Sequence, residues 1–158
     1  MTAQTPAPWR FVAVALLLGL IALVLLLLVD RPREGREHAS MARGTLRGLA
    51  GAQMVFRQGD KDGDGTLDYG TLSELAAAQL IDAPLGSGTK LGYTFVCQPG
   101  ADPLATWFAF ANPIPGSPEQ RAFFVNQDGV IHARDGSPIT VAEVKSGCLP
   151  PAGCAPLP

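Results

Sequence analysis

The stretch FVAVALLLGLIALVLLLLV, residues Phe11–Val29, decides how the rest of the chain is organised. It runs for nineteen residues without a charged or polar side chain. As a helix it would be about 28 Å long, close to the thickness of the hydrocarbon core of a bilayer. Trp9 and Arg10 precede it and Asp30 and Arg31 follow it, and these residue types are typical of a membrane–water interface. We therefore predict a transmembrane anchor over residues 11–29.

A cleaved signal peptide is the alternative interpretation of this stretch. The apolar region of a signal peptide is usually about 7–15 residues long and is followed closely by a small-residue cleavage site. Here the apolar run is longer, and the charged segment DRPREGRE, residues 30–37, follows it. The nearest Ala-x-Ala-like sequence, residues 39–42, begins ten residues beyond the apolar run. The pattern favours an uncleaved anchor.

The remaining length and the charge limit what the chain can be. Of 158 residues, about 120 follow the anchor, which is enough for one small domain. The net charge of −2 gives no indication of a nucleic-acid partner. The predicted organisation is a disordered lead (1–10), the anchor, a juxtamembrane linker (30–38), a globular domain (39–147) and a proline-rich tail with cysteines (148–158).

Helical spacing returns at the start of the globular domain. Apolar residues then recur on one face of a helix at Ala42, Leu46, Leu49, Ala50 and Phe56. Three glycines weaken this helix, so we expect packing against a sheet to stabilise it. A capping-box pattern at residues 71–74 predicts a second, short helix.

From Gly92 onward the apolar period changes to two. Four short strands are predicted, at residues 93–97, 106–111, 121–125 and 130–134, and loops without helices connect them. Such a series forms an antiparallel meander. The predicted fold is α+β: an N-terminal transmembrane helix continues into an amphipathic helix, which packs on a four-stranded antiparallel sheet.

The sequence DKDGDGTLD, residues 60–68, is the strongest local motif. Carboxylates at positions 1, 3, 5 and 9 with Gly at position 6 match the first part of an EF-hand loop. The predicted ligands of a weakly bound Ca²⁺ are Asp60, Asp62, Asp64, the backbone carbonyl of Thr66, and Asp68. Position 12 holds Thr71 instead of the bidentate Glu, and an Asp/Gly-rich turn without a cation is the alternative.

Three cysteines, Cys97, Cys148 and Cys154, are the candidates for a disulfide. A Cys97–Cys148 bond would close a long loop and is slightly favoured over a Cys148–Cys154 bond, although the sequence alone does not decide between them. Neither their spacing nor the positions of the two histidines suggests zinc. We find no catalytic arrangement and do not expect an enzyme.

The orientation of the domain follows from conflicting signals. Arginines concentrate after the apolar run, which by the positive-inside rule places the domain in the cytoplasm. The cysteines and the calcium-type loop favour an oxidising, calcium-rich compartment instead. We predict a single-pass inner-membrane protein with its C-terminal domain on the periplasmic or extracellular side.

The order of motifs resembles that of type IV pilin-like proteins and the pseudopilins of type II secretion. The resemblance covers about residues 40–135, through LRGLAGAQMVFRQGD, the DGDG–TLDYGTLSEL segment, the GYTF strand and the FFVNQDGVIHA hairpin. It implies a long helix on an antiparallel sheet and calcium sites like those of some relatives. The prepilin cleavage motif is absent, because no Gly precedes the apolar run and no Glu lies in it.

The resemblance and the anchor together give the expected function. We expect a membrane-anchored, pilin-like structural or interaction protein of the bacterial cell envelope, part of a filament or secretion assembly. Its partners would be the lipid bilayer, through residues 11–29, and other pilin-like subunits or itself. The alternative is a calcium-responsive extracytoplasmic binding module on a single-pass anchor.

Overall fold

A computed structural model describes residues 8–117, 119–144 and 147–157, and for residues 8–14 and 25–34 it describes the backbone only. The chain begins with one long helix, α1 (Pro8–Gln58), followed by two short helices, α2 (Leu72–Ala77) and α3 (Ala83–Gly86). Among the described residues, six strands form one antiparallel sheet in which each strand pairs with the next in the chain. They are β1 (Thr89–Lys90), β2 (Tyr93–Pro99), β3 (Trp107–Pro113), β4 (Arg121–Asn126), β5 (His132–Asp135) and β6 (Ala155–Pro156). The segment after β5, described over residues 136–144 and 147–157, is called the C-terminal tail from here on and contains a 3₁₀ turn, η1 (Val141–Glu143).

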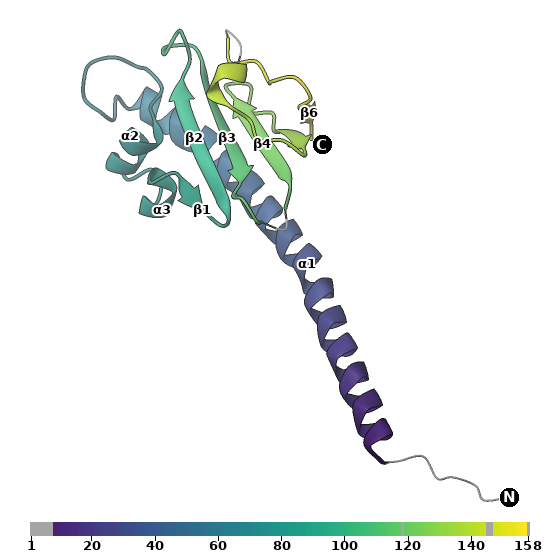
Figure 1. The fold of residues 1–158 in the computed structure, drawn as a ribbon. Coiled ribbons are helices and arrows are strands. Elements are labelled where there is room, and N and C mark those ends of the chain that lie inside the picture. Colours follow the sequence, from purple (N-terminus) through teal and green to yellow (C-terminus); the bar gives the residue numbers. More distant parts are fainter. Residues whose placement is uncertain (1–7, 118, 145–146, 158) are drawn as a thin grey trace, which may run out of the picture.

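Helix α1 has two parts with different surroundings. Its C-terminal part lies across one face of the sheet, and its N-terminal part extends away from the head (Figure 1). The buried residues of the packed part recur every three or four positions: Ala42, Leu46, Leu49, Ala52, Gln53 and Phe56. The predicted amphipathic helix and its apolar face are therefore confirmed. Residues 30–38, expected to be a linker, lie inside this helix, as do residues 8–10 of the expected lead.

The transmembrane helix predicted over residues 11–29 is corrected by the structure. Among the residues that the structure describes, no helix is long and apolar enough to cross a membrane. Within this segment the side chains of residues 15–24 are described, and all of them are exposed. The side chains of residues 11–14 and 25–29, and the lead over residues 1–7, lie outside the described part of the chain.

The prediction of an α+β fold with an antiparallel meander is confirmed, but the number of strands is wrong. The four expected strands correspond to β2–β5, and two edge strands of two residues each complete the sheet. Strand β1 forms because Leu91 and Gly92, with φ of 53° and 74°, make a two-residue turn between Lys90 and Tyr93. Strand β6 pairs with His132 and Ala133, so the tail is not wholly irregular. Pairs this short carry no periodicity that a sequence pattern could reveal.

Both faces of the sheet are covered, which gives the head two core layers. The larger layer lies between α1 and the sheet and includes Phe56, Tyr93, Phe95 and Phe123. The smaller layer lies on the opposite face, where residues of the C-terminal tail cover the aromatic side chains. Its buried members are Phe108, Phe110, Ala122, Phe124, Ile139 and Cys148.

Candidate functional site

The acidic loop connects the end of α1 to α2 and stands out from the body of the head (Figure 1). It follows the last turn of α1, where the amide of Gly59 donates to the carbonyl of Val55 and the amide of Lys61 to that of Phe56. Gly63 and Gly65, with φ of 72° and 84°, adopt conformations that favour glycine and allow the tight turn. The residues from Lys61 to Leu67 are exposed. The loop is therefore exposed to solvent and is attached to the head at its two ends.

Three of the five predicted ligands come together in this loop. One carboxylate oxygen each from Asp60, Asp62 and Asp64 lies within 4.8 Å of the others. Oxygens that share a Ca²⁺ at 2.3–2.6 Å lie no more than about 5 Å apart, so this spacing suits one cation. The Asp60 carboxylate also accepts the amide of Gly65 at 3.2 Å, and the Asp64 carboxylate accepts that of Thr66 at 2.7 Å. The cluster is exposed and could bind a metal ion.

Of the other two predicted ligands, Asp68 is not part of this three-residue cluster, and the role of the Thr66 carbonyl stays a prediction. Thr66 donates its amide to the Asp64 carboxylate. Asp68 lies near enough for its charge to interact: burial, followed by repulsion from Asp64 and Asp62, raises its pKa. Asp68 therefore belongs to the electrostatic surroundings of the cluster.

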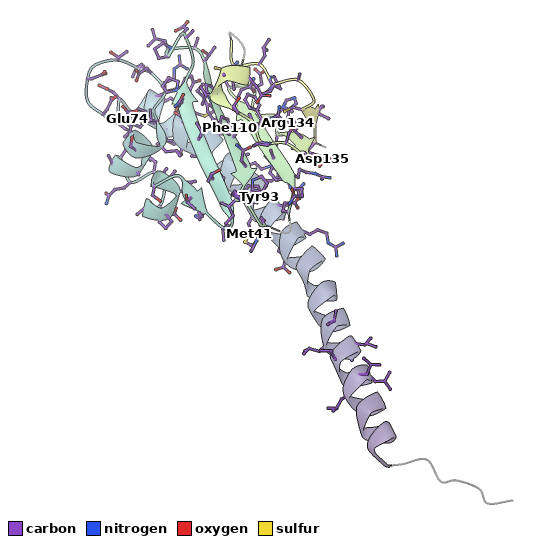
Figure 2. All side chains as sticks on the ribbon, in the orientation of Figure 1. Met41, Glu74, Tyr93, Phe110, Arg134 and Asp135 are labelled. Atoms are coloured by element: carbon purple, nitrogen blue, oxygen red, sulfur yellow. The ribbon has the colours of Figure 1, made fainter. Side chains whose placement is uncertain are left out.

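The position that should close an EF-hand is engaged elsewhere. Thr71 is the N-cap of α2 and forms the predicted capping box with Glu74. The Glu74 carboxylate accepts the Thr71 amide at 2.7 Å and the Thr71 hydroxyl at 2.9 Å. Glu74 lies on α2 beside the loop in Figure 2. Both residues are therefore engaged in the start of α2, Glu74 through its Oε2.

The cysteines lie on different faces of the sheet. Cys97 is buried in the layer beneath α1, whereas Cys148 is buried in the opposite layer and Cys154 packs beside it. All three are free thiols. The favoured Cys97–Cys148 disulfide does not fit this arrangement, because the sheet separates the two side chains. Alternating burial along β2 already indicates the face of Cys97, but the path of the tail cannot be inferred from its sequence.

The N-terminal part of α1 is a second candidate functional surface. Seven large apolar side chains between residues 16 and 24 are 46–71% exposed, which is unusual for a helix surface. They lie on the part of α1 that extends away from the head (Figure 1). They belong to Leu16, Leu17, Leu18, Leu20, Ile21, Leu23 and Val24.

Sequence reasoning missed the residue that fastens the loop, Gln53. Its side chain is fully buried on the sheet-facing side of α1. Its Nε2 donates to the carbonyl of Gly70 at 2.5 Å and to the Cys97 thiol at 3.0 Å, and its Oε1 accepts the Gly70 amide at 2.9 Å. A signal was present: a polar amide stands at a helical position between Leu49 and Phe56, both of which are buried.

No family model matches the chain, and no curated protein and no solved structure is significantly similar to it. The resemblance to pilin-like proteins therefore stays a hypothesis.

Proposed function

We propose that this protein is a pilin-like structural protein of the bacterial cell envelope that assembles through the exposed part of α1. Its partners would be copies of itself or other pilin-like subunits in a filament or secretion assembly, with the head on the periplasmic or extracellular side. The observation that carries the proposal is the division of α1 into a C-terminal part that packs on the sheet and an N-terminal part whose described side chains, at residues 15–24, are apolar and exposed. A helix that is 51 residues long exceeds what the head needs for its own core.

The exposed apolar surface supports association through this helix. Large apolar side chains in water are unfavourable by about 25 cal/mol for each Å² exposed, so a partner that covers them is favoured. Neighbouring helices that pack side by side would bury these side chains and leave the heads outside the contact. The shape of the molecule, a rod with a head at one end, supports such a bundle (Figure 1).

Site-specific photo-crosslinking in the intact cell envelope tests the proposal. A photoreactive amino acid is placed at Leu17 or Ile21 on the exposed part of α1, and at Ser73 on the exposed surface of α2 as the control. We expect the two helix positions to capture the same chain or another pilin-like chain, and Ser73 to capture far less. If Leu17 and Ile21 yield no protein adduct, assembly through α1 is excluded.

A charged variant adds an independent readout. Leu17→Asp together with Ile21→Asp should abolish the adducts formed from a probe at Leu20. The melting temperature of the head should stay the same, because these side chains are exposed and pack on no part of the head. Undiminished adducts in this variant would contradict the proposal.

The acidic loop favours a second candidate function, a calcium-responsive binding module. The observation is the convergence of the carboxylates of Asp60, Asp62 and Asp64 within 4.8 Å. Three carboxylates supply the hard oxygen ligands that Ca²⁺ prefers, and the missing closing carboxylate predicts weak affinity, in the range of about 10⁻⁴–10⁻³ M.

Calorimetric titration of the whole protein with Ca²⁺ tests this function. Asp62→Asn removes one carboxylate from the cluster, and Glu37→Gln removes the same charge from an exposed position on α1 roughly 35 Å away along the helix. We expect binding heat in the wild type and in Glu37→Gln, and none in Asp62→Asn. Equal heats in all three proteins, or no heat at millimolar Ca²⁺, would exclude the site.

A further inference from the structure

The exit of the acidic loop is fastened to one face of α1. The Gln53 amide binds both backbone groups of Gly70, and the Phe56 ring lies so close that a Cβ on Gly70 would meet its Cε1 at 3.0 Å. One helical turn from Gln53, Arg57 donates from Nε to the carbonyl of Leu67 at 3.1 Å. Residues 53, 56 and 57 share a helix face, so a single turn of α1 holds the whole exit.

Tyr69 supplies the remaining attachment of the exit. The Arg57 guanidinium lies 5.2 Å from the centre of the Tyr69 ring, and that ring lies 6.2 Å from the Trp107 ring. The Tyr69 amide donates to the carbonyl of Pro103 in the loop between β2 and β3. A hollow of about 370 Å³ lies beside Tyr69, Trp107 and Met54 and leaves room for the ring to move.

The fastened exit covers a buried thiol. Cys97 on β2 is 3% exposed, and its Sγ contacts the Gln53 amide at 3.0 Å and the Gly70 carbonyl at 4.0 Å. In contrast, the preceding residues 61–67 are exposed, and among the described residues two bonds tie them to α1: the Lys61 amide to the Phe56 carbonyl, and Arg57 to the Leu67 carbonyl. Segments with few buried contacts are those that open locally while the rest of a domain stays folded.

We propose that residues 59–70 form a strap that opens and closes on α1 and β2 while the rest of the head stays folded, with Gln53 as its latch. In the closed state the Gln53 amide pairs with Gly70 and the strap covers Cys97. In the open state the strap leaves the helix, and both the Gly70 amide and the Cys97 thiol meet solvent. The sheet and the packed part of α1 do not change.

Hydrogen exchange and thiol alkylation on the full chain test this device together. Gln53→Met keeps the volume of the side chain but removes both hydrogen bonds to Gly70, whereas Gln58→Met changes an exposed glutamine of the same helix. We expect Gln53→Met to speed exchange of the Gly70 amide and alkylation of Cys97 on the order of tenfold or more. Gln58→Met should leave both rates unchanged, and peptide mass spectrometry separates Cys97 from the other two cysteines.

Reference amides distinguish strap opening from loss of the whole fold. The amides of Phe110 and Phe124, in β3 and β4, should keep their wild-type exchange rates in Gln53→Met. The proposal is overturned if Gly70 exchange does not change, or if Gly70 and Phe124 accelerate together. Should Gln53→Met fail to fold, Gly70→Ala replaces it, because its Cβ would meet the Phe56 ring and push the exit off the helix. The same two readouts and the same criteria then apply.

Discussion

The guanidinium of Arg134 is almost wholly buried beneath the C-terminal tail and forms hydrogen bonds with several turns of that tail. It donates to the carbonyls of Ser137, Pro138 and Ala152 and forms an ion pair with Glu143, Nη1 to Oε1, at 2.9 Å. Figure 2 shows Arg134 on β5 beside the tail. By binding these carbonyls, the Arg134 side chain supplies hydrogen bonds to backbone groups of the tail that lie outside regular secondary structure.

The pH dependence of stability should report this ion pair. Hydrogen bonds from Arg134, and then from Thr140, lower the pKa of Glu143 to about 2 from its ordinary value of 4.5. The folded-state pKa is depressed, so the carboxylate stabilises the fold above pH 4.5, and this contribution is lost as the pH falls toward about 2. Unfolding by urea at a series of pH values should show this loss in the wild type. The Glu143→Gln variant should be less stable at pH 7, and its free energy of unfolding should change less with pH over that interval. If this pH dependence is the same in the variant as in the wild type, the assignment to Glu143 is contradicted.

Alkylation at pH 8 should modify the three cysteines in a fixed order. Burial raises the pKa of Cys97 to about 12, against the opposing hydrogen bond from Gln53, so roughly one thiol in ten thousand is ionised. Burial also raises the pKa of Cys148 and of Cys154, but Cys154 is only half-buried. A time course with iodoacetamide, read by mass spectrometry, should show Cys154 reacting first and Cys97 last. Early modification of Cys97 in the wild type would mean that its cover is absent.

At the scale of elements, a variant at the start of α2 distinguishes the helix-capping role of Glu74 from a role in binding the cation. Glu74→Ala removes the capping-box bonds to Thr71 and should lower the free energy of unfolding by about 1 kcal/mol. The heat of Ca²⁺ binding should not change, since Glu74 is not part of the three-carboxylate cluster. Urea unfolding and calorimetry on the same samples measure both. Loss of the calcium heat in Glu74→Ala would show that the capping glutamate closes the metal site instead.

An element can be predicted from the sequence when the residues that specify it lie within one segment. The amphipathic part of α1, strands β2–β5 and the capping box of α2 follow from spacing within each segment, and all are confirmed. The edge strands β1 and β6 are two residues long and depend on pairing partners, so no period marks them. Of the loop ligands, Asp60, Asp62 and Asp64 converge as expected because alternate residues of a tight turn share one side. Gln53 and the faces of the cysteines depend on how distant segments pack, which local spacing does not encode.

At the scale of the whole molecule, the tail forms the outer layer of the head. Ile139 and Cys148 are buried against Phe108, Phe110 and Phe124, and Asn112 anchors Ile139 through two hydrogen bonds of 2.8 Å. Ending the chain after Pro138 should therefore expose these aromatic rings. We expect the truncated protein to bind a hydrophobic dye strongly and to lose cooperative unfolding. Sharp, wild-type-like unfolding of the truncated chain would show that one core layer is sufficient.

The same tail is synthesised after the helix and the strands that it covers, so the head is completed only once the tail has emerged. The cover of the second face includes Ile139 and Cys148, and the amide of Leu157 donates to the carbonyl of Ile131. A nascent chain that has already extruded α1 and most of the sheet therefore keeps an aromatic surface open until the segment that covers this surface has also left the ribosome tunnel. During that interval the surface is what a chaperone or a neighbouring nascent chain would meet.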